Sequence, residues 1–501
     1  MHELPNQGIA PSPDHLARPR DLGGVIPESQ THPTHALVIG GGIAGLVTAR
    51  VLSDHFDIVT VVERDQFPTK PVPRPGVPQG HHLHVLLMRG QQILEQLFPG
   101  LQAELAAAGA PEMDWLGDVV WFTMDRWAPR FSSRMQTNFS SRNLLEWSIR
   151  RRLAQNPRVH LLGGRRVTGL ITDDRRSRVT GISFAFSFAP SQEQELSADL
   201  IVDASGRESK LSAWLEAIGY PRPPENVVNS FLGYASRIYQ PPPDFHADWK
   251  GILLTATPPE STRGAVIFPI EGGRWIANLG AGNHDYPPTD EQGFLEFAGS
   301  LPVSAIYDAL RQAKPLTPIY GYRRTENRWR RYDRLSRWPE NLVALGDAVC
   351  AFNPVYGQGM TVAALGALSL GEIIRTEHRR KPDGDLTGLA RRFQSRLAKV
   401  NETPWSMATG VDFVYPDTEG ERPGSLNRVL NGYMYQVRML TFDRPEVHRL
   451  FFEVVHLVKP PSVLLSPRIA RQVLGRIVHE EFRPSNPPPS RRSYAKSNSE
   501  L

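Results

Sequence analysis

Cysteine is almost missing from this sequence of 501 residues, because Cys350 is the only one. A single thiol excludes an intramolecular disulfide framework and any cysteine-rich zinc or iron–sulfur site. We interpret Cys350 as a small buried residue, and we expect the chain to work in a reducing cytoplasm. At this length a sizeable hydrophobic core forms without disulfides or metals.

Long apolar runs are missing as well. The N-terminus has no apolar segment of the kind found in signal peptides. The most apolar stretch, Met360 to Ile374, contains Gly366 and Glu372 and is shorter than the roughly 20 residues that span a bilayer. Integral membrane insertion is therefore excluded, whereas contact with a membrane surface stays an unfavoured alternative.

An excess of one charge is lacking too. Lys and Arg number 57 against 52 Asp and Glu, which gives a net charge of +5. Nucleic acid is not an expected partner, because aromatic platforms and a dedicated fold are absent. No internal repeat is visible, which excludes solenoids and propellers.

The two ends differ from the middle of the chain. Residues 1–34 and 483–501 are rich in Pro and polar residues without periodicity, and we expect a disordered leader and tail. Between them, Ala36 to Ile39 is a short apolar run, Ala44 to Leu52 has helical spacing, and Ile58 to Val62 is β-branched. This order predicts a βαβ unit of a doubly wound sheet.

Further apolar runs predict more elements along the chain. Strands are expected at Asp118–Thr123, Ser133–Asn138, Val159–Leu162, Gly181–Phe188, Leu200–Val202 and Leu342–Leu345, and a hairpin at Ala265–Ile270 and Trp275–Leu279. Helices are expected at about Leu144–Leu153 and after Gly359, and the pattern from about Leu386 to Glu480 is mostly helical.

The first chemical motif is the glycine turn of residues 40–45, Gly-Gly-Gly-Ile-Ala-Gly. It follows a predicted strand, opens a helix and is answered about 20 residues later by Glu63, at the end of the next strand. Glycines permit a tight turn and close approach of a pyrophosphate, and the carboxylate can accept hydrogen bonds from a ribose. We therefore predict a dinucleotide site that includes Gly40, Gly42, Ile43, Ala44 and Gly45.

The second motif distinguishes a flavin from a nicotinamide nucleotide. Gly346-Asp347-Ala348 follows a predicted strand, and Pro354 leads to Gly357-Gln358-Gly359-Met360 at a helix start. Asp347 is placed to bond a ribityl hydroxyl, and the N–H groups of residues 357–360 would stabilise an anionic reduced ring. The pair of motifs favours a flavin.

Together these segments resemble the FAD-dependent monooxygenases with the p-hydroxybenzoate-hydroxylase fold. The resemblance rests on GGGIAG, Glu63-Arg64, DASGR at residues 203–207, GDAVCAFNPVYGQGM, GVPQGHHLHVLL and EGGRWI. Within that family the chain is most similar to the bacterial polyether polyene epoxidases. Squalene epoxidases and geranylgeranyl reductases are more distant relatives.

The resemblance implies an α/β fold of three parts. A Rossmann-like FAD-binding domain of the glutathione-reductase type would comprise residues 35–115, 140–225 and 338–385. An inserted β-sheet substrate domain would comprise 116–139 and 226–337, and a helical region 386–482. In the substrate domain we expect Trp121, Phe122, Phe268 and Trp275 to wall an apolar cavity, with the aromatic stretch Val429–Val473 packing over it.

The cofactors implied are non-covalent FAD and NAD(P)H as reductant. By position, Glu63 and Arg64 would contact the adenosine, and Arg74 would lie along the FAD. Arg142 would reach the flavin side, and Val167 would offer its backbone to adenine. Asp347, Pro354, Gly357, Gly359 and Met360 would surround the ribityl chain and the ring. One departure is Ser205, which stands where many members have the acidic residue of an Asp-Gly pair, so NAD(P)H docking is an open question.

Two other clusters, of histidines and of arginines, are interpreted as structural. His81, His82 and His84 lack a carboxylate or cysteine partner at useful spacing, so no metal is expected; His84 is the only candidate for a catalytic side chain, and a structural role is favoured for it. Seven arginines, Arg323, Arg324, Arg328, Arg330, Arg331, Arg334 and Arg337, form a basic run. We interpret it as a solvated or ion-paired face, with an NADPH-phosphate site as the alternative.

The function implied is that of an NAD(P)H-dependent monooxygenase. A flavin C4a-hydroperoxide would insert one atom of dioxygen, by epoxidation or hydroxylation, into a largely apolar polyketide, terpenoid or aromatic substrate. A separate flavin reductase is an open partner. Two alternatives stay open: a FAD-dependent reductase or cyclase acting on isoprenoid double bonds, and a non-catalytic flavin-binding protein.

Overall fold

A five-stranded parallel sheet carries the glycine turn and lies at the base of the fold. The computed structural model describes residues 33–422 and 424–481, and the predicted leader and tail lie outside them except for residues 33 and 34. The strand order is β20-β11-β1-β2-β7. The strands are β1 (His35–Ile39), β2 (Ile58–Val62), β7 (Val159–Leu162), β11 (Leu200–Asp203) and β20 (Leu342–Ala344).

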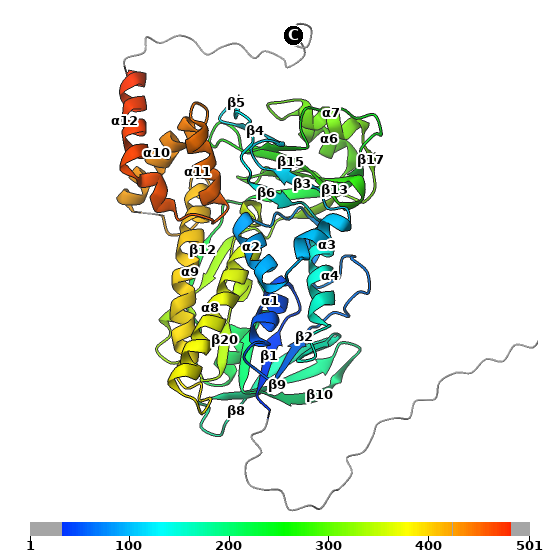
Figure 1. The fold of residues 1–501 in the computed structure, drawn as a ribbon, viewed down its shortest axis with the longest axis vertical. Coiled ribbons are helices and arrows are strands. Elements are labelled where there is room, and N and C mark those ends of the chain that lie inside the picture. Colours follow the sequence, from blue (N-terminus) through cyan, green and yellow to red (C-terminus); the bar gives the residue numbers. More distant parts are fainter. Residues whose placement is uncertain (1–32, 423, 482–501) are drawn as a thin grey trace, which may run out of the picture. The chain divides into compact units, whose positions relative to one another are not determined.

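The predicted βαβ unit is confirmed, with α1 (Ile43–Leu52) between β1 and β2. Its strands are buried almost throughout, as expected for a parallel sheet covered on both faces. The long helix α8 (Gly359–Arg380) begins where predicted and packs beside α1 (Figure 1). An antiparallel sheet of β8 (Arg165–Thr172), β9 (Val179–Phe186) and β10 (Ala189–Ser197) joins the same core.

A second, eight-stranded sheet forms the inserted part, in the order β17-β13-β16-β15-β14-β4-β5 with β18 beside β13. Its strands are β4 (Val119–Thr123), β5 (Arg126–Trp127), β13 (Gly233–Gln240), β14 (Gly251–Leu254), β15 (Arg263–Ile270), β16 (Arg274–Ala281), β17 (Lys314–Pro315) and β18 (Tyr320–Tyr322). The predicted hairpin is confirmed as β15 and β16. Helices α6 (Glu291–Gly299) and α7 (Ala305–Gln312) cover one face (Figure 1).

The four expected wall residues do not share a face of this sheet. Trp121 and Phe268 belong to a cluster with Phe139 and Phe452, whereas Phe122 and Trp275 are buried under α6 and α7. The expectation that all four wall one cavity was therefore wrong, and none of them lines the pocket described below. Adjacent residues of a strand point to opposite faces, and the sequence does not say which face is the inner one.

Four helices form the C-terminal region, which confirms the helical pattern predicted there: α9 (Leu389–Asp412), α10 (Ser425–Leu440), α11 (Pro445–Val455) and α12 (Pro467–Glu481). Helices α10 to α12 share a small core of their own. Phe451 and Phe452 of α11 also pack on the second sheet, on the face away from α6 and α7. The aromatic stretch therefore covers the substrate sheet, as expected.

One predicted strand is shorter than expected. Only residues 136–138 of Ser133–Asn138 form a strand, β6 (Gln136–Asn138), which pairs with β3 (Glu112–Asp114). The Asp114 carboxylate accepts hydrogen bonds from the N–H groups of Ser133 and Arg134, so the chain turns there with Arg134 at φ 59°. Other local boundaries shift by a few residues; β9 ends at Phe186 and α4 (Arg142–Leu153) begins earlier than predicted.

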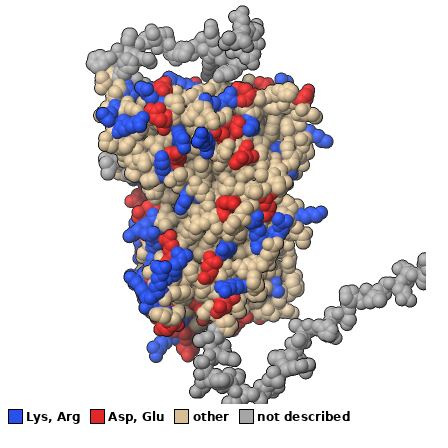
Figure 2. Space-filling model, in the orientation of Figure 1, with Lys and Arg blue, Asp and Glu red and all other residues tan. Residues whose placement is uncertain are grey.

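The remaining elements are short. They include α2 (Met88–Leu97), α3 (Leu101–Ala107), α5 (Leu211–Ala217) and a three-stranded sheet of β12 (Glu225–Val228), β19 (Asn327–Arg330) and β21 (Cys350–Ala351). Cys350 is buried in β21, as expected. Within the described ranges, no helix is both long and apolar enough to cross a membrane. On the face shown in Figure 2, basic and acidic side chains are interspersed.

Candidate functional site

The glycine turn brings β1, β11 and α1 into close contact. Gly40 has φ +103°, and a Cβ atom there would lie 2.7 Å from the carbonyl oxygen of Ala204. A Cβ atom on Gly45 would lie 1.8 Å from the Gly40 carbonyl oxygen, so only glycine fits either position. Gly42 differs, because the nearest atom to its Cβ position is Arg142 Nη2 at 3.8 Å. A Cβ atom at Gly42 would therefore meet no steric clash, and Arg142 lies beside the start of α1.

Glu63 is held against this turn. Its carboxylate accepts hydrogen bonds from the N–H groups of Gly41 (2.7 Å) and Asp65 (3.0 Å), and it pairs with Arg74 at 3.1 Å. Glu63 is 5% exposed. The turn encloses Glu63, which is therefore more buried than Asp347.

Arg74 joins three carboxylates. It contacts Glu63, Asp65 at 2.8 Å and Glu146 at 2.9 Å. Although burial acts to lower it, the pKa of the Arg74 guanidinium is raised by Glu146 and Glu63. The Arg74 Nη2 atom is buried without a hydrogen-bond partner.

Arg142, Arg64 and Val167 lie around the same turn. Arg142 begins α4 and pairs with Glu146 at 3.4 Å, and its Nε atom is buried without a partner. Arg64 is exposed and donates to the Gly76 carbonyl oxygen. Val167 lies on β8 two residues beyond Arg165, whose N–H donates to the Glu63 carbonyl oxygen.

The second motif meets the first in space. A Cβ atom on Gly346 would lie 3.1 Å from Cβ of Ala44 in α1, and one on Gly359 would lie 3.6 Å from Asp347 Oδ1. The Asp347 carboxylate thus lies at the start of α8. Burial raises the pKa of Asp347, and the nearby charges of Arg207, Arg142 and Arg330 oppose that rise.

Two buried arginines hold the segment between Asp347 and Asn353, and we did not single them out for this role. Arg207 donates to the carbonyl oxygen of Phe352 at 2.9 Å, and Arg330 donates to that of Ala348 at 3.0 Å. Arg207 lies in the DASGR segment and Arg330 in the basic run. Neither motif indicates which carbonyl oxygens these arginines bind. Their contacts join residues far apart in sequence.

Residues 353–358 form a loop, hereafter the α8 loop, that leads from β21 into α8. The Asn353 N–H donates to Asn327 Oδ1 at 2.7 Å, and its side chain accepts from the Val355 N–H. A short 3-10 helix, Pro354–Tyr356, is followed by Gly357. Asp412 at the end of α9 accepts from the hydroxyl of Tyr356 and the side chain of Asn353.

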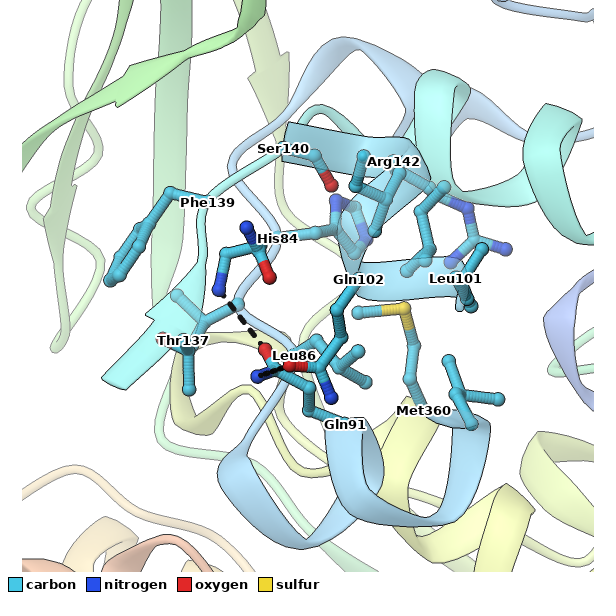
Figure 3. Close-up of a pocket in the computed structure, with 15 residues that line it drawn as sticks. His84, Leu86, Gln91, Leu101, Gln102, Thr137, Phe139, Ser140, Arg142 and Met360 are labelled. Carbon is cyan, nitrogen blue, oxygen red and sulfur yellow. Dashed lines mark hydrogen bonds between the residues drawn. The ribbon is translucent and has the colours of Figure 1, made fainter. Parts of the chain in front are cut away.

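A pocket adjoins the first turn of α8 (Figure 3). Its wall is formed by Met360, by apolar residues of α2 and α3, and by Phe139 and Ser140, which follow β6. Gln91 Nε2 donates to Gln102 Oε1 at 2.9 Å, and the Asn138 N–H donates to Gln91 Oε1. His84 and Arg142 are the titratable side chains in its lining.

Comparison with known proteins decides the family. Residues 33–386 match the family described as FAD binding domain. The chain belongs to this family. It is also 36% identical over 382 residues to Protein Rv3254 of Mycobacterium tuberculosis (strain ATCC 25618 / H37Rv), covering 74% of this chain and 79% of that one.

Solved structures share the fold. The flavin-dependent brominase Bmp2 superimposes with a TM-score of 0.61 at 15% identity, covering 89% of this chain and 99% of that one. PqsL, a probable FAD-dependent monooxygenase from Pseudomonas aeruginosa, gives 0.55 at 17% identity, covering 77% and 97%. The predicted fold class, an FAD-binding domain with an inserted sheet and a helical C-terminal region, is confirmed.

The residues present in this FAD-binding family member fit the cofactor. Along the two motifs, four buried polar atoms find no hydrogen-bond partner among the residues that the structure describes: Arg74 Nη2, Arg142 Nε, Gln358 Oε1 and Thr361 Oγ1. Burying polar groups unpaired is costly, so such atoms mark places where a polar ligand belongs. Arg74 and Arg142 lie beside the Glu63 turn, and Gln358 and Thr361 lie at the start of α8.

The three histidines near the pocket have separate partners. His81 stacks on Tyr320, His82 Nδ1 lies 2.9 Å from the Ser236 hydroxyl, and His84 Nδ1 donates to the His82 carbonyl oxygen. Burial, helped by the charge of Arg142, lowers the pKa of His84 to about 3. In residues 33–422 and 424–481, no group of three His, Cys, Asp or Glu side chains is arranged to hold a metal.

The basic run is largely ion-paired, as interpreted. Arg324 pairs with Glu208, Arg328 with Glu225, and Arg331 with Asp333. Arg330 is paired as well, with Glu225 at 3.3 Å, and it is also buried against the Asp347 segment.

A carboxylate lies close to Ser205 after all. The Ser205 hydroxyl donates to Asp203 Oδ1, which also accepts from the Ser205 N–H at 3.0 Å, and the Ser209 hydroxyl donates to Oδ2. Asp203 is fully buried at the end of β11. Burial raises its pKa, and the two serine hydroxyls oppose that rise. An acidic residue, Asp203, is therefore present two residues before Ser205, and it is buried and hydrogen-bonded to that serine.

Proposed function

We propose that this chain is an FAD-dependent monooxygenase that inserts one atom of dioxygen into a largely apolar organic substrate. The observation that carries the proposal is the composition of the pocket beside α8. Its lining is mostly apolar and amide-bearing, and it holds no pair of titratable groups that could act as acid and base. The reaction must therefore draw its chemistry from the cofactor.

His84 does not change this conclusion. Its Nδ1–H is committed to the His82 carbonyl oxygen, so Nε2 is left as an acceptor. Because its pKa is lowered to about 3, the ring stays neutral at physiological pH. A neutral imidazole can accept a hydrogen bond from a substrate or from the cofactor, and it gives no proton to the reaction.

The chain's own residues would hold FAD along the two motifs. Glu63 would bind the adenosine ribose, Gly42 and Arg142 would flank the pyrophosphate, and Asp347 would bond the ribityl chain. Reduced FAD supplies the activation of dioxygen when it is bound. The N–H groups at the start of α8 would lie nearest the ring and favour negative charge on it.

The other task of the protein is to exclude water. Six aromatic residues, called here the aromatic cluster, extend from the pocket over the second sheet: Trp115, Trp121, Phe139, Phe268, Phe451 and Phe452. Phe139 belongs to both the pocket and the cluster. A wall of this composition keeps water from a reactive oxygen species and suits an apolar substrate.

The finer features of the proposal rest on the motifs. Resemblance to the polyether polyene epoxidases supports epoxidation of a polyketide, terpenoid or aromatic substrate, with hydroxylation as the related reaction. We propose that the reaction takes place in the cytoplasm. NAD(P)H is the proposed source of electrons. Because Asp203 is buried behind Ser205, we propose that a separate flavin reductase assists the reduction.

The test uses purified holoenzyme, NAD(P)H and candidate polyenes and aromatics, with and without dioxygen, an added flavin reductase and bromide. The proposal predicts an oxygenated product that requires dioxygen and is unchanged by bromide. A saturated or cyclised product formed without dioxygen would establish a reductase or cyclase. A brominated product would instead establish a halogenase, and no turnover under any condition would favour a non-catalytic flavin-binding protein.

A further inference from the structure

Arg438 of α10 is a half-buried arginine without an acidic partner. Its Nη2 donates to the hydroxyl groups of Thr123 and Thr255, the latter at 3.1 Å. Its Nε atom is buried and has no hydrogen-bond partner. Among the Asp and Glu side chains that the structure describes, none forms an ion pair with it. Burial lowers the pKa of the Arg438 guanidinium to about 10, and the neighbouring ionisable groups that act on it are two tyrosines, Tyr415 and Tyr435.

An arginine in such surroundings is costly. Two neutral hydroxyl groups satisfy some of its donors and leave its charge uncompensated. The buried arginines Arg74 and Arg207 have carboxylate partners, whereas the buried Arg150 contacts the Pro68 carbonyl oxygen and the ring of Phe67. Burial of this unpaired charge therefore destabilises the fold, and an anion bound to Arg438 would offset the loss.

His448 of α11 is a second unpartnered polar group on the same side. It is 2% exposed, and neither of its ring nitrogens has a hydrogen-bond partner. Its ring lies 5.7 Å from that of Trp121, and the Arg438 guanidinium lies 5.8 Å from the same Trp121 ring. Three donors or acceptors in one aromatic environment thus lack partners within the described residues.

The aromatic cluster connects this place with the pocket at α8. Phe139 in the pocket wall is 5.0 Å from Trp115, which is 6.4 Å from Phe452. Phe452 is in turn 5.2 Å from Trp121, the ring beneath Arg438. A continuous row of rings therefore leads from the proposed reaction site to an unpaired cation, where the C-terminal helices meet the second sheet (Figure 1).

We propose that Arg438 anchors a carboxylate at one end of an elongated apolar substrate, whose body lies along the aromatic cluster toward the α8 pocket. His448 would contribute a hydrogen bond beside this anchor. This proposal takes from the proposed function that the pocket is the reaction site. The carboxylate on the substrate is inferred from Arg438 alone. It narrows the substrate class from apolar compounds in general to conjugated or aromatic acids.

The test is a binding measurement on the FAD-loaded protein without reductant. The probes are 5-phenyl-2,4-pentadienoic acid and its primary amide, followed by tryptophan fluorescence and by the visible absorption of the flavin. A hydrogen-bonded charge pair predicts that the acid binds at least about tenfold more tightly than the amide. Equal affinities, or no binding of the acid at millimolar concentration, would overturn the proposal without any variant.

Variants then locate the preference. Arg438→Met should abolish the preference for the acid, Arg438→Lys should keep part of it, and Arg471→Met on the exposed side of α12 should leave it intact. A preference that survives Arg438→Met with normal FAD content would contradict the anchor. If Arg438→Met does not fold, Arg438→Lys decides the matter, because a point charge should reduce the preference without removing it.

Failure of this proposal and failure of the proposed function give different results. Acid-selective binding that depends on Arg438, together with no oxygenated product, would leave the anchor standing and refute the monooxygenase. Oxygenation of neutral substrates by a protein that binds acid and amide equally would do the reverse.

Discussion

The Tyr356 hydroxyl donates a hydrogen bond of 2.5 Å to the carboxylate of Asp412, which is completely buried at the end of α9. Tyr356 belongs to the α8 loop, and the Asn353 side chain of the same loop donates to the same carboxylate oxygen, Oδ1, at 3.3 Å. Asn327 of β19 also donates to Asp412. One carboxylate of the helical region therefore holds the loop that leads to the proposed flavin ring.

This carboxylate should make stability depend on pH. Burial raises the pKa of Asp412 to about 6, against hydrogen bonds that lower it. The folded protein therefore binds this proton more tightly than the unfolded chain does, and the contribution of Asp412 is most favourable at low pH and is lost as pH rises through 6. Between pH 4.5 and 7.5 the loss should be about 2 kcal/mol.

The measurement is urea unfolding of the FAD-loaded protein and of Asp412→Asn across this pH range. The difference in unfolding free energy between the two proteins cancels the other titrating groups. It should shift in favour of the variant as pH rises. A difference that stays constant from pH 4.5 to 7.5 would show that Asp412 is ionised throughout.

Asp347→Ala should weaken FAD retention without unfolding the chain. The lost hydrogen bond involves a charged acceptor and is worth about 1.5–3 kcal/mol, which is roughly tenfold to over a hundredfold in affinity. Equilibrium dialysis of FAD against the apoprotein measures it, with the exposed Asp174→Ala as control. Equal affinity for FAD in Asp347→Ala and the unaltered protein would show that Asp347 has only a structural role in the turn.

Glu63→Ala should harm both FAD affinity and stability. The variant leaves the N–H groups of Gly41 and Asp65 without their acceptor and removes one of the three carboxylates around Arg74. We expect a loss of about 1–3 kcal/mol in unfolding free energy of the apoprotein. Glu63→Gln, which keeps one acceptor oxygen, should lose less. Unchanged stability in both variants would contradict the enclosed position of Glu63.

The variant His84→Gln tests whether His84 is a neutral imidazole or a catalytic base. Because the folded-state pKa of about 3 is below the unfolded value, the contribution of His84 is complete above about pH 6.5 and is lost as pH falls. The unaltered protein should therefore lose about 2 kcal/mol more than the variant between pH 7 and 5. The pH profile of kcat from 7 to 9 should be the same in both proteins; a limb that disappears in His84→Gln would make His84 a base.

Local patterns predicted the glycine turn and the βαβ unit that contains it. The spacing from the glycine turn to Glu63 places the carboxylate against the Gly41 N–H, as the βαβ unit requires. The strand Val159–Leu162 and the start of α8 at Gly359 also follow from apolar runs and glycine punctuation. These features depend on residues close in sequence.

The parts that could not be predicted depend on distant contacts. Arg207, Arg330 and Asp412 act on the segment around Asp347 and the α8 loop from other elements, and nothing beside them in the sequence names their targets. Strand β10 was missed because its residues are mostly exposed and polar, which hides the alternation of a strand. Phe122 and Trp275 were misplaced because sequence gives the period of a strand and leaves its inner face undetermined.

The measurement that tests the central claim most directly is turnover under isotopically labelled dioxygen. The holoenzyme receives NAD(P)H, a flavin reductase and the conjugated acid that it binds, and the product is weighed by mass spectrometry. The account predicts one labelled oxygen atom per product molecule. It also predicts that omitting substrate slows the use of NAD(P)H or diverts it to hydrogen peroxide. A product whose new oxygen comes from water, or a product without new oxygen, would contradict the account.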